Sequence, residues 1–477
     1  MNTRTDTRPN IVLLFPDQWR HDALSVLGHP VAETPFLDQI AHQGVRFTSA
    51  YSPAPTCIAT RASLATGCSP NTCGRIGYRD FVPWTYPDTF MRLLRDGGYQ
   101  TLCAGKTHFH PARARLGFEE LALYEVEWQT PGEPSDYHRF LLRETGGRVQ
   151  DSATTHDSNS MHAVPWTHDE NLHATNWTVG AALEMLERRD PQRPFFLQVC
   201  PHRPHPPFDP PLAWFERFAN AELPDPPVGD WATEGGHPAT TIDAYGGQVP
   251  KKTFDRNRRA YYAQLAHLDN QFCRLWRFLK GRKLLANTWI FFMSDHGEFL
   301  GDHHLFRKTA PFEGAAHIPL LVKAPDGADV PRDVACDVPL TVADLAPTFL
   351  DIAGIPAPAA MEGRSLLPHV SAPDAAPPPH EFVHIEHAPK WQAVTDGKAK
   401  YVWDSQQGRE WFFDLVADPQ ERHDLSRDPD AAPRVSVWRD RLVAILARRP
   451  EDGLVEDGRL VPGKTFAAVK PGLAGSV

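Results

Sequence analysis

The chain of 477 residues is too long for one ordinary core but suits a large α/β domain with an appendage that can bury an active site. Hydrophobic residues make up 41% and charged residues 23%, which are globular values and exclude a disordered chain. The net charge of −10 argues against a nucleic-acid surface, which needs a basic footprint, so a small-molecule substrate is the better expectation.

The N-terminal segment predicts a cytoplasmic protein that does not contact a membrane. Residues 1–10 contain no apolar run, and residues 11–15 (IVLLF) are too few for a signal or membrane helix. The cysteines have neither the spacing of a disulfide framework nor that of a zinc site, so most are expected to be buried thiols. They are Cys57, Cys68, Cys73, Cys103, Cys200, Cys273 and Cys336.

Apolar runs along the first three quarters of the chain alternate with amphipathic segments. Residues 10–16 predict a buried strand, and 34–44 predict a helix with Thr34 as its N-cap and Gly44 as its stop. Further strands are expected at 100–105, 195–200, 288–293 and 318–323, and a one-sided apolar helix at 258–280. This order predicts an α/β fold with a sheet covered by helices.

Periodicity fades between residues 120 and 175, which predicts a substrate-facing loop. Its aromatic and acidic side chains either hold a cationic or aromatic leaving group or form ordinary surface. They are Trp128, Asp136, Tyr137, Trp166, Asp169 and Glu170.

The chain after the Pro/Ala-rich stretch at 372–380 predicts a smaller C-terminal α+β domain. Short strands are expected within 381–415 and a helix at 432–447. The expected division is therefore a catalytic domain at 1–375 and a C-terminal subdomain at 376–477. Its tail, from about residue 450, is expected to pack on a neighbouring subunit in a homodimer or homotetramer.

Polar residues follow two of the predicted strands. Asp17 and Gln18 come after the first strand, and Asp295 and His296 come after the strand at 288–293. Ligands bind at such strand ends in open α/β sheets, and oxygen donors with one imidazole suit a divalent cation. An isolated Asp-His pair is more often a helix cap, but two such strand ends favour a metal site.

Cys57 lies where a loop gives way to a helix-like run, "SPAPTCIATRASLATG", with Arg61 one turn later. The N-terminus of a helix attracts an anion or stabilises a thiolate, and Arg61 can hold an anionic substrate or the nucleophile. Cations and imidazoles elsewhere follow predicted strands and can line the same anion pocket: Lys106, His108, His202, His205 and Lys308. Together these groups suit transfer of a sulfuryl or phosphoryl group.

These motifs resemble the sulfatase family of the alkaline phosphatase superfamily. The likeness lies in "NIVLLFPDQWRHDALSVLGHP", in the Cys57 segment, in "GYQTLCAGKTHFHP", in "RPFFLQVCPHRPHPPF" and in "SDHGEFLGDHHLFRKTAPFEG". The Asp17-Gln18 form is similar to the bacterial branch of choline sulfatases, cytosolic arylsulfatases and phosphonate monoester hydrolases. The resemblance implies an alkaline-phosphatase-like fold with a large mixed central sheet.

The resemblance also implies a site for one divalent cation (Ca²⁺, Mn²⁺, Mg²⁺ or Zn²⁺), with Asp17, Gln18, Asp295 and His296 as ligands and Cys57 at the same metal. It implies that Cys57 is oxidised to formylglycine by a maturation enzyme and that the hydrated aldehyde attacks sulfur, forming a covalent intermediate. The resemblance also implies that Arg61 holds the diol, which is the hydrated aldehyde, and that Lys106 and Lys308 bind the sulfate. It further implies that His108 and His205 contact the diol and the leaving oxygen.

One residue departs from the family's maturation motif, Cys-x-Pro-x-Arg, because Ala59 stands where the motif has proline. Either a maturase that tolerates alanine acts, or Cys57 stays a thiol. The leading hypothesis is a metal-dependent hydrolase of sulfuric esters, arylsulfatase-like. The alternative on the same scaffold is a phosphodiesterase or phosphonate monoester hydrolase that uses formylglycine or unmodified Cys57. A non-catalytic binding protein is the third hypothesis, and the completeness of the motif set argues against it.

Overall fold

A large mixed sheet forms the centre of the computed structural model, which describes residues 6–126, 130, 132–233, 244–374 and 377–472. Its eight strands lie in the order β11-β2-β10-β8-β1-β6-β4-β5. Strand β10 runs antiparallel to both neighbours, whereas the other neighbouring pairs are parallel. The bounds are β1 Asn10–Leu14, β2 Val45–Phe47, β4 Gln100–Gly105, β5 Glu120–Leu123, β6 Phe195–Cys200, β8 Thr288–Met293, β10 Leu320–Lys323 and β11 Val334–Cys336.

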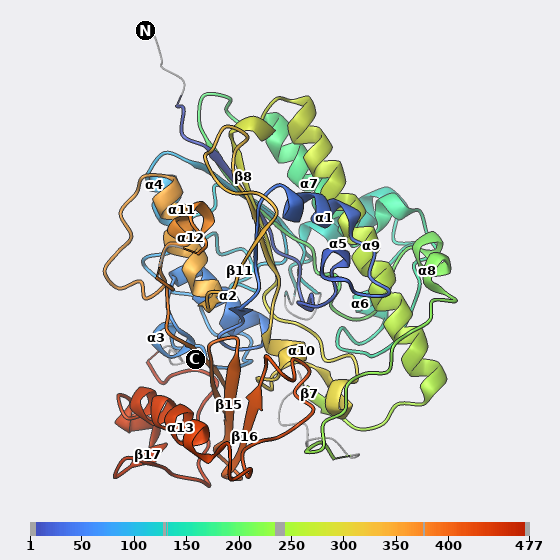
Figure 1. The fold of residues 1–477 in the computed structure, drawn as a ribbon. Helices are drawn as coiled ribbons and strands as arrows, with labels where there is room; N and C mark the ends of the chain where they lie inside the picture. The colour runs from blue at the N-terminus through green and yellow to red at the C-terminus, as the bar shows by residue number, and fades with distance from the viewer. Residues whose placement is uncertain (1–5, 127–129, 131, 234–243, 375–376, 473–477) are drawn as a thin grey trace.

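Helices cover both faces of this sheet, because its strands are apolar on both sides. Alternate residues of β1 face opposite ways: Ile11 and Leu13 lie in one core and Val12 and Leu14 in the other. The first core is covered by α2 Cys57–Thr66, α4 Phe90–Asp96 and α11 Leu345–Ile352. The second is covered by α1 Pro35–His42, α7 Ala174–Arg188 and α9 Lys251–Gly281 (Figure 1). The predicted α/β fold is confirmed.

The predicted helix at 34–44 is present as α1 Pro35–His42 with Thr34 at the N-cap position, but the Thr34 side chain does not cap it. The Thr34 side chain makes no capping bond to α1; its Oγ1 accepts instead from the Ser25 amide. The carboxylate of Asp269, on α9, accepts from the amides of Phe36 and Leu37 at 3.0 and 2.8 Å. A long-range carboxylate has therefore replaced the local cap.

Residues 120–175 are more ordered than a loop. The segment begins with β5, the last strand of the sheet, and continues with α5 Asp136–Thr145, α6 Ser152–Thr155 and a short helix at Glu170–Leu172. Tyr137 and Trp166 are 0% and 4% exposed and pack against the rings of Tyr124 and His173, so they contribute to the packing of this segment. Trp128 lies outside the described residues.

The C-terminal part builds a second, antiparallel sheet, as predicted. It contains β13 Val383–His387, β14 Trp391–Thr395, β15 Ala399–Asp404 and β16 Arg409–Asp414, with α13 Ala432–Leu446 packed against β14 and β15. The hairpin β17 Val455–Glu456 and β18 Arg459–Leu460 follows. The proposed boundary at 375–376 lies outside the described residues and stays a prediction.

The tail after β18 packs against its own chain. The amide of Ile76 donates to the Ala468 carbonyl at 2.8 Å, and the amide of Lys470 donates to Gly74 at 2.9 Å. The homodimer or homotetramer stays a prediction. No helix in the described part of the chain is both long and apolar enough to cross a membrane, and the cytoplasmic location also stays a prediction.

The remaining short elements connect these parts. They are β3 Ala50–Tyr51, α3 Pro70–Cys73, α8 Leu212–Phe218, β7 Ala244–Gly246, β9 Leu305–Arg307, α10 Glu313–Ala316, β12 Leu340–Thr341 and α12 Leu367–Ser371, with single-turn helices at Ser25–Leu27, Leu285–Asn287, Asp302–His304, Val342–Asp344 and Pro450–Asp452. Strands β7 and β9 pair, as do β3 and β12.

Candidate active site

The predicted site residues from three separate segments meet at one edge of the large sheet. Strands β1 and β8 are parallel neighbours, so Asp17 after β1 and Asp295 and His296 after β8 reach the same edge. Cys57 is the first residue of α2, as expected from the sequence. One ligand atom from each of Asp17, Cys57, Asp295 and His296 lies within 4.8 Å of the others.

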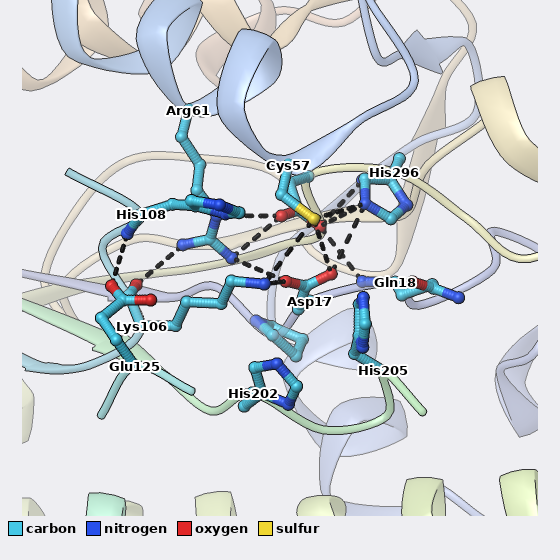
Figure 2. Close-up of polar contacts among 12 residues, drawn as sticks. Asp17, Gln18, Cys57, Arg61, Lys106, His108, Glu125, His202, His205 and His296 are labelled. Atoms are coloured by element: carbon cyan, nitrogen blue, oxygen red, sulfur yellow. Dashed lines mark hydrogen bonds and ion pairs between the residues drawn. The ribbon is translucent and has the colours of Figure 1, made fainter. Parts of the chain in front are cut away.

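This group, called the metal cluster below, has a donor set that fits a divalent cation. The Cys57 Sγ lies 3.2 Å from His296 Nε2 and 3.5 Å from Asp17 Oδ1 (Figure 2). His296 Nδ1 is 2.8 Å from the Gly297 carbonyl and donates to it, so Nε2 keeps its lone pair on the side of the two carboxylates. Two buried carboxylates and a fixed imidazole nitrogen are suitable ligands for such an ion.

Arg61 and Lys106 hold the two carboxylates of the cluster. Arg61 Nη2 lies 2.9 Å from Asp295 Oδ2 and 3.6 Å from Asp17 Oδ2, and its Nη1 donates to the Lys106 carbonyl at 2.8 Å. The Lys106 ammonium lies 2.7 Å from Asp17 Oδ2 (Figure 2). Burial raises the pKa of Asp17, but the charges of Lys106 and Arg61 outweigh it and hold the pKa well below its ordinary value.

The thiol of Cys57 is buried, with 1% of the residue exposed. Burial raises its pKa, and the neighbouring Asp17 carboxylate raises it further, which outweighs the opposing charges of Lys106 and Lys308. The protein's own groups therefore favour the neutral thiol. A thiolate at position 57 needs an additional positive charge.

Lys308 and His205 form a second pair of predicted residues. The Lys308 ammonium donates to His205 Nε2 at 3.0 Å and to Gln18 Oε1 at 2.9 Å. His205 Nδ1 donates to the Pro206 carbonyl at 2.9 Å, and the ring of His202 lies 4.7 Å from that of His205. Burial and then the Lys308 charge hold the pKa of His205 well below its ordinary value, so the ring is neutral.

His108 lies beside the cluster, but its ring turns toward another carboxylate. Its Nε2 lies 3.1 Å from Asp80 Oδ1, and its amide donates to Glu125 Oε1 at 2.6 Å (Figure 2). The sequence reasoning did not single out Asp80 or Glu125. Glu125 follows strand β5 as Asp17 follows β1, so the pattern of a polar residue after a strand could have identified it. No pattern in the sequence identifies Asp80.

Charge in the centre of the site favours an anionic substrate. Arg61 and Lys106 pair with the carboxylates of Asp17 and Asp295, Lys308 donates to Gln18, and all of these charged residues are at most 3% exposed. A divalent cation bound by the two carboxylates would offset their charge and leave the three cationic side chains to attract an anion. Buried donors of this kind are suited to hold an oxyanion during group transfer.

Comparison with known proteins agrees with this reading. The family model described as Sulfatase matches residues 9–355, and the one described as N-sulphoglucosamine sulphohydrolase, C-terminal, matches 301–447. The chain is 35% identical to an arylsulfatase of Clostridium perfringens, covering 97% of this chain and 99% of that protein. It is 28% identical to a choline-sulfatase of Rhizobium meliloti, covering 89% and 84%.

Among solved structures, the phosphonate monoester hydrolase of Agrobacterium radiobacter superimposes with a TM-score of 0.79 at 24% identity, over 92% of this chain and 96% of that one. At that identity the likeness shows a shared fold. Because the family model covers well over half of the chain, the chain belongs to the sulfatase family. Family membership supports hydrolysis of sulfate esters as its class of reaction.

Proposed function

We propose that this protein is a metal-dependent, arylsulfatase-like hydrolase of sulfuric esters with its nucleophile at position 57. The observation that carries the proposal is the metal cluster, in which Cys57 at the start of α2 faces Asp17, Asp295 and His296, with Lys106 and Lys308 alongside. Asp17, Asp295 and His296 would hold one divalent cation, and Gln18 would join them. When bound, such an ion acts as a Lewis acid toward the nucleophile and the substrate oxygen.

The chain's own residues supply binding and proton transfer. Lys106, whose Nζ lies 3.7 Å from Cys57 Sγ, and Lys308 would bind the sulfate oxygens. Attack by the nucleophile forms one bond to sulfur and breaks the ester S–O bond, so the leaving oxygen must gain a proton. The Lys308–His205 pair holds a proton between Nζ and Nε2 and would deliver it.

Formylglycine at position 57 is the finer part of the proposal and rests on the family resemblance. Its hydrated aldehyde would provide one hydroxyl for attack on sulfur and a second whose deprotonation would re-form the aldehyde, break the C–O bond to the sulfate and release sulfate. Arg61 Nη1 and Nη2 are engaged with the Lys106 carbonyl and the Asp295 carboxylate, so Arg61 would orient the surroundings of this diol through those contacts. The maturation enzyme has to accept Ala59.

Hydrolysis of phosphodiesters or phosphonate monoesters is the second candidate. It is favoured by the fold shared with the phosphonate monoester hydrolases of Agrobacterium radiobacter and Silicibacter pomeroyi, the latter with a TM-score of 0.74. Unmodified Cys57 suits this chemistry only with a bound cation, because the surrounding protein raises the pKa of the thiol.

One experiment tests these proposals together. Peptide mass spectrometry at position 57 is combined with parallel assays of an aryl sulfate, a bis-aryl phosphate and an aryl phosphonate on metal-loaded protein. Conversion of Cys57 together with sulfate turnover is the expected result. Absent sulfate turnover in fully converted, metal-loaded protein would overturn the sulfatase proposal, and a free thiol in a protein that prefers phosphonate would establish the second candidate.

A further inference from the structure

A buried carboxylate that no prediction singled out, Glu298, connects the two sides of the site. It is 0% exposed and lies in the turn after β8. One of its oxygens accepts from the Gln18 side-chain amide, and the other accepts from the backbone amides of Leu300 at 3.1 Å and Arg307 at 2.5 Å. Glu298 therefore joins the residue after β1 to the segment that ends at Lys308.

The three residues that donate to Glu298 share an unusual backbone conformation. The φ angles of Gln18, Leu300 and Arg307 are 73°, 49° and 66°, in the left-handed region that non-glycine residues rarely adopt. Such a conformation is strained and persists only where its surroundings fix it. Glu298 is such a constraint for Leu300 and Arg307, because their backbone amides donate to it, and Lys308 is the next residue after Arg307.

The orientation of the Gln18 amide depends on the same carboxylate. The Gln18 backbone is already held, because its amide donates to Asp295 Oδ1 at 3.1 Å and its carbonyl accepts from the Tyr261 hydroxyl at 2.9 Å. The side chain then has two choices, related by a flip of the amide. Glu298 can only accept, so it takes the Nε2 end and leaves Oε1 toward Lys308.

We propose that Glu298 is the positioning residue that turns the oxygen of Gln18 toward the metal cluster and Lys308, and that its charge requires an amide, not a carboxylate, at position 18. The proposal rests on the proposed function in one respect, the role of Gln18 as a ligand of the divalent cation. A glutamate at position 18 would set two carboxylates face to face. A glutamine at position 298 would present its NH₂ group to Gln18 and flip the Gln18 amide.

The test is a double-mutant cycle with Gln18→Glu, Glu298→Gln and the double variant, read as the Kd for Ca²⁺ or Mn²⁺ alone and as the Tm of the metal-free protein. Glu298→Gln is expected to weaken the cation Kd by about 10–100-fold, as loss of a group that orients a ligand does. In the double variant the carboxylate at 18 accepts from the amide at 298, so the affinity returns at least to that of the wild type.

In the metal-free protein, the direction of the Tm change caused by Gln18→Glu should depend on residue 298, which a purely structural role would not produce. Gln18→Glu should lower the Tm when Glu298 is present and raise it when residue 298 is glutamine. The same effect of Gln18→Glu in both backgrounds, or a cation Kd within about 3-fold of wild type for Glu298→Gln, would overturn the proposal. The matched control is Glu386→Gln, which removes another buried carboxylate, 1% exposed and paired with Arg449, and should leave the cation Kd unchanged.

A second pair of variants and a comparison of binding with turnover complete the test. If Glu298→Gln does not fold, Gln18→Glu is compared with the apolar Gln18→Met, and a Tm loss no larger for Gln18→Glu would overturn the proposal. The binding and melting readouts need no turnover. If the variants show the coupling but fully converted, metal-loaded wild type does not hydrolyse aryl sulfate, the proposed function is refuted and the Glu298 assignment is supported.

Discussion

Two of the buried clusters of ionisable side chains in the described part of the chain differ in whether their members pair with one another or point toward a common position. The first is the metal cluster of Asp17, Cys57, Asp295 and His296. The second, called the latch cluster here, consists of Glu313, His317, Lys400 and Glu421 and joins α10 to the C-terminal sheet. Lys400, on β15, is 0% exposed and pairs with both glutamates.

The histidines show the difference most clearly. Both ring nitrogens of His317 face acceptors, with Nδ1 2.6 Å from Glu313 Oε2 and Nε2 3.0 Å from the Thr48 carbonyl. His296 has its backbone acceptor at Nδ1 only, and Nε2 faces Cys57 and Asp17. A cluster that satisfies its own groups holds the fold together, whereas one that directs lone pairs at a common point is suited to bind an ion.

The largest effect is expected from removing the nucleophile. Cys57→Ala should lower kcat/KM for an aryl sulfate by at least about 1,000-fold, because the covalent route is lost and only binding and electrostatic contributions remain. Stability should change little, since a small thiol is replaced. Cys273→Ala, which removes a half-exposed thiol, is the control and should keep full activity. Turnover by Cys57→Ala within tenfold of wild type would show that the nucleophile is misassigned.

The latch cluster should respond in stability rather than in cation binding. Lys400→Met leaves Glu313 and Glu421 buried without their shared cation, and such a loss costs about 3–5 kcal/mol of the free energy of unfolding. Denaturant unfolding measures the loss, and calorimetric Ca²⁺ titration of the folded variant should give the wild-type Kd. Lys398→Met is the control, because its ion pair with Asp337 is exposed. If Lys400→Met weakened Ca²⁺ binding and Lys398→Met did not, the latch cluster would also contribute to cation binding and the distinction between the two clusters would fail.

The sequence was sufficient to predict the strands that carry the site, because each is a mainly apolar run followed by polar residues. It also predicted that Asp17 and Asp295 would meet, because their strands end at one edge of a sheet. It could not predict that Arg61 would bind both carboxylates, since that depends on how α2 packs.

The residues that hold the site in place were mostly missed, for reasons specific to each. Glu298 lies in the segment that begins "SDHGEF", but the sequence does not show its partners. Gln18 is 280 positions away, and Arg307 donates from a left-handed backbone conformation that the sequence does not predict. Strand β5 has only four residues, three of them half-buried, so its apolar signal is weak. Asp269 replaced Thr34 at the start of α1 through a contact across 233 positions of sequence.

A smaller effect is expected in how the free energy of unfolding depends on pH through Glu421 of the latch cluster. Burial raises the pKa of Glu421 from 4.5 to about 7, so the folded state binds a proton that the unfolded state has released between these values. This contribution to stability is full below pH 4.5 and is lost as pH rises through about 7. Relative to wild type, Glu421→Gln should lack this decline, which is at most about 1.4 kcal/mol per pH unit. Parallel pH dependences would show that Glu421 is already ionised.

The smallest structural effect is expected at Ala59, where the family motif has proline. The first backbone bond of α2 runs from the Thr60 amide to the Thr56 carbonyl at 3.1 Å, so the Ala59 amide lies in the first turn, where helix amides have no partner within the helix. Ala59→Pro therefore removes no helical hydrogen bond, and its cost comes from extra atoms at a 0% exposed position, about 1–2 kcal/mol. Conversion of Cys57 by a maturase that prefers proline should rise, as measured by peptide mass spectrometry. Unchanged conversion of Cys57 in a folded Ala59→Pro variant would show that Ala59 does not limit maturation. The control is Ala62→Ser, further along the same buried helix, which should leave conversion unaltered.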